Sequence, residues 1–97
     1  MSYFAGSVDL VPGSVHAIPE EGLTLGRSTD AGLRIGSSQI ARAHAQLRVV
    51  DDALEVVDLG STNGVQVDGQ RVVQARLRAG DRFTLAEAFD FEVVTAP

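Results

Sequence analysis

The stretch Gly60-Ser61-Thr62-Asn63-Gly64 separates two runs that alternate apolar and polar residues, 54–59 before it and 65–67 after it. Alternation of this kind predicts a β-strand on each side, so the five residues form a loop between strands. Glycine allows backbone conformations that other residues disfavour, and Ser, Thr and Asn carry short side chains that donate and accept hydrogen bonds. The loop is therefore suited to binding a ligand, or it is a tight turn whose polar groups satisfy only its own backbone.

Similar alternations recur along the chain about every 8 to 12 residues, which is typical of an all-β antiparallel sandwich. The predicted strands are 4–10, 14–18, 23–25, 33–35, 43–50, 54–59, 65–67, 71–73, 82–85 and 89–94. Pro12-Gly13 and Asp68-Gly69 are expected to be hairpin turns, and Gly80-Asp81 a further turn. Ala86-Glu87-Ala88 is compatible with one helical turn, although it is too short to nucleate a helix.

The composition fits one small globular domain over residues 1–97, because 44% of the residues are hydrophobic and no low-complexity block interrupts them. The apolar runs are far shorter than the roughly 20 residues of a membrane helix, and no targeting segment is evident. We therefore expect no direct membrane contact. The chain has no cysteine, which is compatible with a reducing compartment. A cytoplasmic location is expected, either alone or as the cytoplasmic part of a larger or membrane-linked protein.

The net charge of −5 argues against general binding to nucleic acids or anionic membranes, which rely on a broad positive surface. All eight basic residues are arginines, and they lie between Arg27 and Arg82. Arginine presents a planar fork that suits carboxylate and phosphate groups, so a local basic patch on an acidic body is one interpretation. A genomic bias in composition is the other.

No arrangement of residues typical of a catalytic or metal site is present. The two histidines, His16 and His44, lack the spacing of metal ligands, and the chain has neither a Gly-x-Ser-x-Gly motif nor the lysine of a nucleotide-binding phosphate loop. A hydrolase that uses Ser61 or Ser38 would rest only on the presence of hydroxyl groups. We therefore expect no enzyme activity, no metal and no cofactor.

Five short motifs follow one another at regular intervals over nearly the whole chain. They are Gly26-Arg27, Ala41-Arg42-Ala43-His44, Ser61-Thr62-Asn63-Gly64, Asp68-Gly69 and Gly80-Asp81. Together they resemble the forkhead-associated (FHA) domain, whose pattern is Gly-Arg, Ser-Arg-x-His, Ser-x-Asn-Gly, an Asn-Gly-like hairpin and a late Gly-Asp turn. Each motif alone is weak, but five in register identify the chain as a member of this family.

The resemblance implies an FHA-like β-sandwich of the SMAD/FHA type, with about eleven short strands, whose rim loops bind a phosphothreonine peptide without catalysis. The implied phosphopeptide-binding residues are Arg27, Arg42, Thr62, Asn63, Ser61, Ala41 and Ser38. The two arginines and the Thr62 hydroxyl would bind the phosphate, and Asn63 would hold the peptide backbone. Gly26, His44 and Gly64 are implied to be structural, with His44 packed under the loops.

The chain departs from the family pattern at Ala41, where the family has a phosphate-binding serine. Losing a hydrogen bond to a charged group weakens binding by about 1.5 to 3 kcal/mol, or about ten- to a hundredfold. Ser37 or Ser38 could supply the hydroxyl, or both could be plain loop residues. A smaller departure is Leu85-Ala86, where the family often has glycine, so the adjacent loop is expected to differ.

The sequence thus favours a phosphothreonine-recognition module in signalling. Its expected partner is a threonine-phosphorylated protein or peptide, either a kinase substrate or a kinase, and not a nucleic acid. The alternative is a degenerate domain that keeps the sandwich and docks to an unphosphorylated partner or within its own protein. The missing hydroxyl at Ala41 keeps this alternative open.

Overall fold

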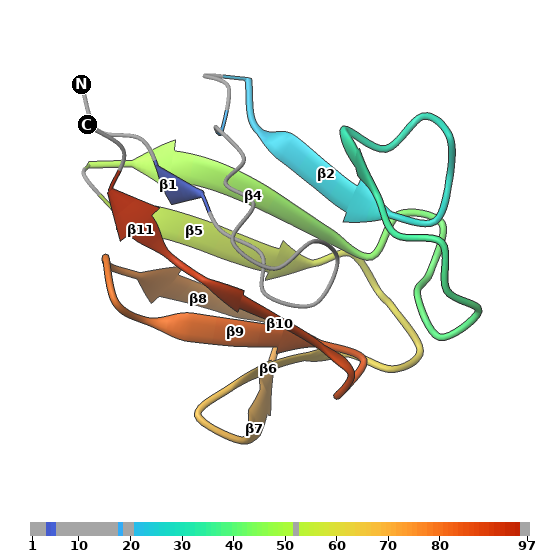
Figure 1. Cartoon of the computed structure of the whole chain (residues 1–97). Helices are drawn as coiled ribbons and strands as arrows, with labels where there is room; N and C mark the ends of the chain where they lie inside the picture. The colour runs from blue at the N-terminus through green and yellow to red at the C-terminus, as the bar shows by residue number, and fades with distance from the viewer. Residues whose placement is uncertain (1–3, 6–17, 19–20, 52, 96–97) are drawn as a thin grey trace.

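The computed structural model describes residues 4–5, 18, 21–51 and 53–95, and Figure 1 shows how they are arranged. The strands are β1 (Phe4–Ala5), β2 (Leu23–Gly26), β3 (Leu33–Arg34), β4 (Ala45–Val50), β5 (Ala53–Asp58), β6 (Val65–Val67), β7 (Gln70–Val72), β8 (Gln74–Leu77), β9 (Arg82–Leu85), β10 (Phe89–Glu92) and β11 (Val94–Thr95). The described residues contain no helix, so the prediction of an all-β fold is confirmed. In particular, they include no helix with the length and apolar character that crossing a membrane requires.

The strands form two larger sheets and one short pair. One sheet has the order β3-β2-β4-β5-β8, the other has the order β10-β9-β6-β7, and β1 pairs with β11. Neighbouring strands are antiparallel, as expected, except that β3 lies parallel to β2. Residues from both larger sheets share one hydrophobic core, as in a β-sandwich. The total number of strands and the limits of the domain remain predictions, because much of the N-terminal segment lies outside the described residues.

Alternation along the strands places the core between the sheets. In β4, Ala45 and Leu47 are buried whereas Arg48 is exposed, as expected for a strand with one face on the core. Within the other sheet, Phe83 of β9 and Phe91 of β10 are cross-strand partners whose buried rings stack with centroids 5.1 Å apart. Burying each large apolar side chain of this kind contributes about 1.5 to 3 kcal/mol, so the core fixes the strands on which the loops are mounted.

Predicted turns and strands agree with the structure in part. Asp68 and Gly69 have φ angles of 52° and 77°, as the predicted two-residue hairpin between β6 and β7 requires. Strand β8 is absent from the strands predicted from the sequence, although Gln74-Ala75-Arg76-Leu77 alternates polar and apolar residues as a half-buried strand does. The predicted hairpin at Pro12-Gly13, with most of the strands on either side of it, lies outside the described residues.

Residues 86–88 do not form the single helical turn with which their sequence is compatible. Ala86 and Glu87 have φ angles of 56° and 57°, and the Ala88 N–H donates to the Leu85 carbonyl oxygen at 3.0 Å, so these residues form a tight left-handed turn between β9 and β10. Left-handed backbone favours glycine, which gives a physical reason for the glycine that the family often has here.

Candidate functional site

Three loops meet at one end of the sandwich, on the right in Figure 1. Residues 27–32 connect β2 to β3, residues 35–44 connect β3 to β4, and residues 59–64 connect β5 to β6. We call these three segments the rim loops. They contain every residue that the sequence assigned to phosphopeptide binding, and hydrogen bonds tie them to one another.

Loops 27–32 and 35–44 are joined through their backbones. The Arg27 N–H donates to the Ala41 carbonyl at 2.9 Å, and the Ser28 N–H donates to the Arg42 carbonyl at 3.2 Å. This close approach begins at Gly26, the last residue of β2. A Cβ atom there would collide with the Arg42 carbonyl oxygen and lie 2.8 Å from the carbonyl carbon. Only glycine therefore lets the two loops come together.

His44 joins loop 35–44 to loop 59–64 and is completely buried. Its Nδ1 accepts a hydrogen bond from the Ala41 N–H at 3.1 Å, and its Nε2 lies 2.8 Å from the Gly64 carbonyl oxygen. An acceptor at Nδ1 and a donor at Nε2 define one neutral tautomer of the ring, assigned here from its partners. His44 therefore lies beneath the loops as a cross-link and does not face a ligand.

Loop 59–64 is folded around the Ser61 side chain. The Ser61 hydroxyl and N–H both donate to Asp58 Oδ1, at 2.8 and 2.9 Å, and the hydroxyl accepts from the Gly64 N–H at 3.0 Å. Ser61 is buried, so its hydroxyl shapes the loop from within. From β7, Arg71 Nη2 donates to the Ser61 carbonyl at 2.9 Å. A Cβ atom on Gly64 would lie 2.5 Å from Arg71 Nε, so the Arg71 side chain covers this glycine.

Arg27 and Asn63 come from different loops and reach two successive carbonyl groups. Arg27 Nε donates to the Ile40 carbonyl at 3.1 Å, and Asn63 Nδ2 donates to the Gln39 carbonyl at 2.8 Å. Both side chains are therefore tied to the same short segment of loop 35–44. Arg27 keeps four further N–H groups, and Asn63 keeps its amide oxygen and a second N–H, for other partners.

The other predicted binding residues belong to the same loops but have looser surroundings. Arg42, Thr62 and Ser38 are exposed, and no hydrogen bond joins their side chains to another described residue. Ala41 is half-buried, and its N–H and carbonyl are occupied by His44 and Arg27. Arg42 and Thr62 thus offer free donor groups, whereas Ala41 presents only a methyl group.

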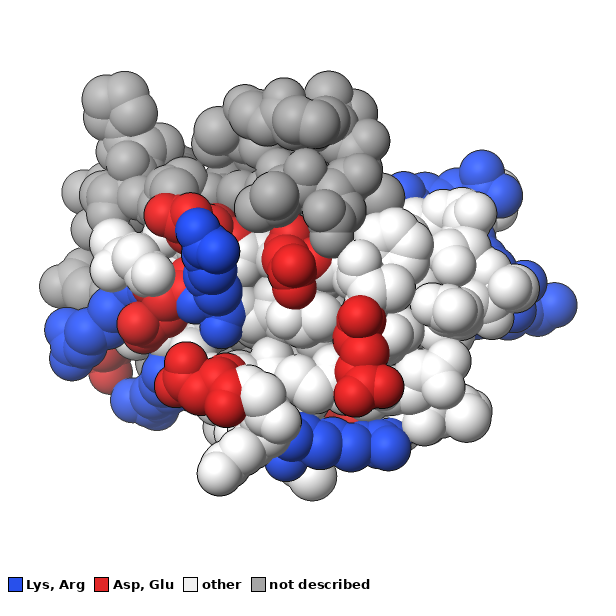
Figure 2. All heavy atoms as spheres, turned by 60° about the horizontal axis from the view of Figure 1, so that its bottom comes forward, with Lys and Arg blue, Asp and Glu red and all other residues white. Residues whose placement is uncertain are grey.

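The rim loops are the basic end of an acidic protein. This end carries three arginines, namely Arg27, Arg42 and Arg34 of the neighbouring β3, whereas the rim loops contain one acidic residue, Asp30. None of the four forms an ion pair with another described residue; the ion pair recorded among these residues joins Arg82 to Glu92 on the opposite sheet. Figure 2 shows basic side chains without visible acidic ones at the same end of the molecule.

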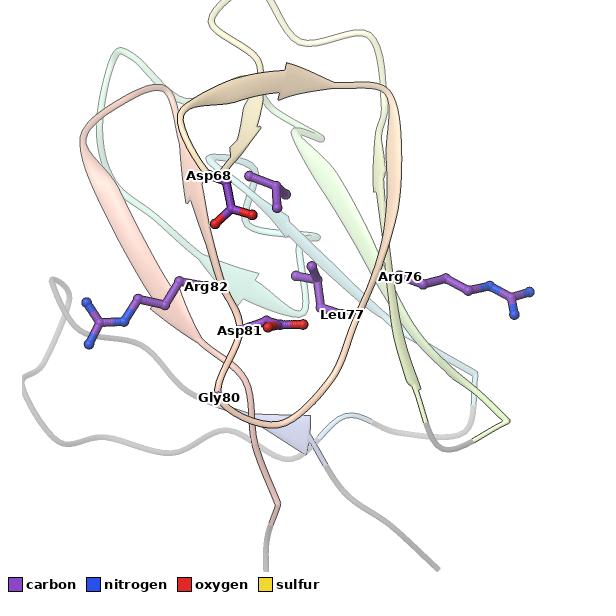
Figure 3. Close-up of a pocket in the computed structure, with 7 residues that line it drawn as sticks. Asp68, Arg76, Leu77, Gly80, Asp81 and Arg82 are labelled. Carbon is purple, nitrogen blue, oxygen red and sulfur yellow. The ribbon is translucent and has the colours of Figure 1, made fainter.

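Among the described residues, one hollow lies at the edge of a rim loop and another lies away from the rim loops. One, of about 470 Å³, borders loop 59–64 and is lined by Asp58, Gly60, Ser61, Arg71, Val72 and Val73. The other, of about 360 Å³, lies between the β6–β7 turn and the β8–β9 turn (Figure 3). The carboxylates of Asp68 and Asp81 point into this second hollow, while Arg76 and Arg82 point away from it. Such a lining is unsuited to a phosphate group. Among the described residues, no three His, Asp or Glu side chains gather as metal ligands would.

Several residues of the site were not predicted from the sequence. Arg34 donates through Nε to the Arg27 carbonyl at 3.1 Å, and the parallel pairing of β2 with β3 was needed to find it. Asp58 and Arg71 hold loop 59–64 from neighbouring strands. Gln39 acts through its backbone carbonyl, so the identity of its side chain gave no indication of this role in the sequence. The spacing Asp58-x-x-Ser61 is one signal that the sequence did offer, since short polar side chains often bond the backbone within a turn.

Comparisons with known proteins agree with this geometry. The family model described as FHA domain matches residues 23–86. The glycogen accumulation regulator GarA of Mycolicibacterium smegmatis is 29% identical over 85 residues, which are 88% of this chain and 53% of that protein. The oxoglutarate dehydrogenase inhibitor of Corynebacterium jeikeium is 31% identical over 75 residues, 77% of this chain and 52% of that protein. The chain thus spans about half the length of these curated relatives.

Solved structures show the same fold. A domain studied in a structural and functional analysis of phosphothreonine-dependent FHA domain interactions has a TM-score of 0.86 and 27% identity, covering 100% of this chain and 99% of its own. The FHA domain of the CT664 protein from Chlamydia trachomatis has a TM-score of 0.87 and 23% identity, covering both chains completely.

Proposed function

Because the chain belongs to the FHA domain family, we propose that it recognises phosphothreonine in a partner protein as a non-catalytic signalling module. The partner would be a kinase substrate or a kinase, and nucleic acid or a membrane surface would not be bound. Two relatives are named for regulating glycogen accumulation and for inhibiting oxoglutarate dehydrogenase, which supports a regulatory role through protein contacts. The module would work in the cytoplasm, where kinases have ATP.

The observation that carries the proposal is the meeting of Arg27 and Asn63 at the carbonyls of Ile40 and Gln39. In this arrangement Arg27, with Arg42 and the Thr62 hydroxyl, would donate charge-assisted hydrogen bonds to a dianionic phosphate. Asn63 would hold the peptide backbone beside the phosphothreonine. Because His44 cross-links two of the loops, the backbone that carries Arg42, Thr62 and Asn63 is held before the ligand arrives, which lowers the entropy lost on binding.

The hydroxyl missing at Ala41 could be supplied from the same loop. Ser38 is exposed and immediately precedes Gln39, whose carbonyl binds Asn63. The hydroxyl oxygen of Ser37 instead accepts a hydrogen bond from the Gln39 N–H at 3.2 Å, so this side chain shapes the loop. We therefore propose Ser38 as the substitute donor and Ser37 as a structural residue.

The methyl group of Ala41 also favours a second candidate function, docking to a partner that carries no phosphate. The remaining arginines would then bind carboxylates with lower affinity, either on another protein or within the chain's own protein. A degenerate domain of this kind would keep the buried hydrogen bonds of His44 and Ser61, since these stabilise the loops whether or not the domain binds phosphate.

Calorimetric titration with matched peptides that carry threonine or phosphothreonine separates the two candidates. The first predicts phosphate-dependent binding that Arg42→Gln and Thr62→Val both weaken. Arg76→Gln serves as the charge control, because Arg76 lies on β8 and points outward (Figure 3). Equal affinity for both peptides would support docking without phosphate. Binding of neither peptide at millimolar concentration would overturn the phosphothreonine proposal.

A further inference from the structure

The arginines at the rim have more binding capacity than a single phosphate site uses. Arg27, Arg34 and Arg42 form no ion pair with any described residue. Exposed arginines on an acidic protein attract anionic ligands, and the attraction is strongest where several cations are close together. The proposed function assigns Arg27 and Arg42 to the phosphate, and Arg34 is left without a role.

Arg34 is positioned by a specific contact. It is exposed on β3 and pairs with Gly26 in the parallel register, so it lies alongside the start of loop 27–32. Its Nε donates to the Arg27 carbonyl at 3.1 Å. One of its five N–H groups is therefore used for anchoring, and the four on Nη1 and Nη2 are left for a ligand.

A charged residue on an edge strand can also act simply by preventing other strands from pairing there, and β3 is the edge of its sheet. That role needs only a charge that points into water. The contact with the Arg27 carbonyl instead holds the guanidinium against the residue that would bind phosphate. The position of the Arg34 guanidinium therefore indicates that it takes part in binding a ligand, in addition to protecting the edge strand β3 from pairing.

We propose that Arg34 binds a carboxylate that flanks the phosphothreonine, so that the preferred ligands are phosphothreonine peptides with Asp or Glu near the modified residue. This inference rests on the proposed function. Adjacent strands lie about 4.8 Å apart, and an extended peptide advances about 3.3 Å per residue. A carboxylate one or two residues from the phosphothreonine therefore lies within reach of a guanidinium on the strand next to β2. An arginine fork matches a carboxylate with two parallel hydrogen bonds.

The test compares two phosphothreonine peptides that differ only in their flanking residues, Glu in one and Gln in the other. Each is titrated into the unaltered protein, Arg34→Gln and Arg76→Gln. The unaltered protein and Arg76→Gln are expected to prefer the Glu peptide by about three- to tenfold, the range between an exposed ion pair and a charge-assisted hydrogen bond. In Arg34→Gln that preference is expected to disappear while phosphate-dependent binding remains.

The possible failures are distinguishable. If the unaltered protein does not distinguish phosphorylated from unphosphorylated peptide, the proposed function is wrong, and this inference is wrong with it. If phosphate-dependent binding is present but Arg34→Gln retains the preference for the Glu peptide, only the role of Arg34 is wrong. An equal loss for both peptides in Arg34→Gln would show that Arg34 merely supports the Arg27 backbone, and this result too would overturn the inference. Unchanged melting temperatures exclude unfolding as the cause.

Discussion

At the scale of single residues, substitutions of His44 and Asn63 should distinguish a residue that supports the rim loops from a residue that contacts the ligand. His44→Ala leaves the Ala41 N–H without its partner, removes one of the two hydrogen bonds to the Gly64 carbonyl and opens a cavity, so we expect a loss of about 2 to 4 kcal/mol in the free energy of unfolding. Asn63→Ala removes one exposed hydrogen bond and should cost about 1 kcal/mol or less, yet abolish phosphopeptide binding. Urea unfolding and calorimetry measure the two effects. Equal losses of stability would contradict this division of roles.

Restoring a hydroxyl at position 41 tests whether the rest of the phosphate site is intact. Ala41→Ser adds a donor near groups that the proposed function places on the phosphate, so affinity for a phosphothreonine peptide should rise by about 1 kcal/mol or more. Affinity for the unphosphorylated peptide should not change. The same titration on Ser38→Ala should weaken phosphopeptide binding if Ser38 already replaces the missing group. No detectable phosphopeptide binding by Ala41→Ser would favour the degenerate domain.

The sequence predicted which loops lie together better than it predicted the hydrogen bonds that those loops make. Arg27 and Asn63 could be placed at one rim because loop positions follow from strand order. The inward orientation of the Ser61 hydroxyl was not predicted, although the spacing Asp58-x-x-Ser61 indicates the local hydrogen bond to the Asp58 carboxylate that fixes it. Arg34 was missed since its neighbour Arg27 is reached only across a parallel strand pair.

At the scale of elements, the turn between β9 and β10 contains backbone strain that a substitution can relieve. Glu87 is exposed and has a φ of 57°, where Asn is tolerated better than Glu. We expect Glu87→Asn to raise the free energy of unfolding by about 0.5 to 1 kcal/mol. Glu87→Gln removes the same charge without relieving the backbone and is the matched control. A similar gain in both variants by urea unfolding would attribute the effect to charge instead.

Turns and strands could be predicted from the sequence where their own residues determine the backbone conformation. The β6–β7 hairpin follows from Asp68-Gly69, since both positions adopt positive φ angles. The β9–β10 turn has no such marker, because Ala and Glu favour helix and the pairing of the two flanking strands forces them into the left-handed region. Strand β8 alternates polar and apolar residues over only four positions, and its pairing with β5 joins residues about 20 positions apart in the chain, so the sequence alone does not place it in the sheet.

At the scale of the whole molecule, charge separation should govern how ligands associate. The protein carries a net charge of −5, yet Arg27, Arg34 and Arg42 at the rim form no ion pair with a described residue, so phosphopeptide affinity should fall as salt screens them. The screening length shrinks from about 10 Å at 0.1 M salt to about 3 Å at 1 M. Binding should also weaken below about pH 6, where protonation removes the second negative charge of the phosphate. An affinity that changes with neither salt nor pH would indicate apolar docking.

The short pair β1–β11 determines how the domain responds to tension. Phe4 pairs with Thr95 in antiparallel register, so the chain enters and leaves the domain at the same end of this pair. In Figure 1 the pair lies opposite the rim loops. Pulling on the two flanking segments would act across the pair and unzip its hydrogen bonds one after another, which needs less force than shearing them together. A partner held by the rim loops would remain bound during this first opening, because the tension does not pass through those loops.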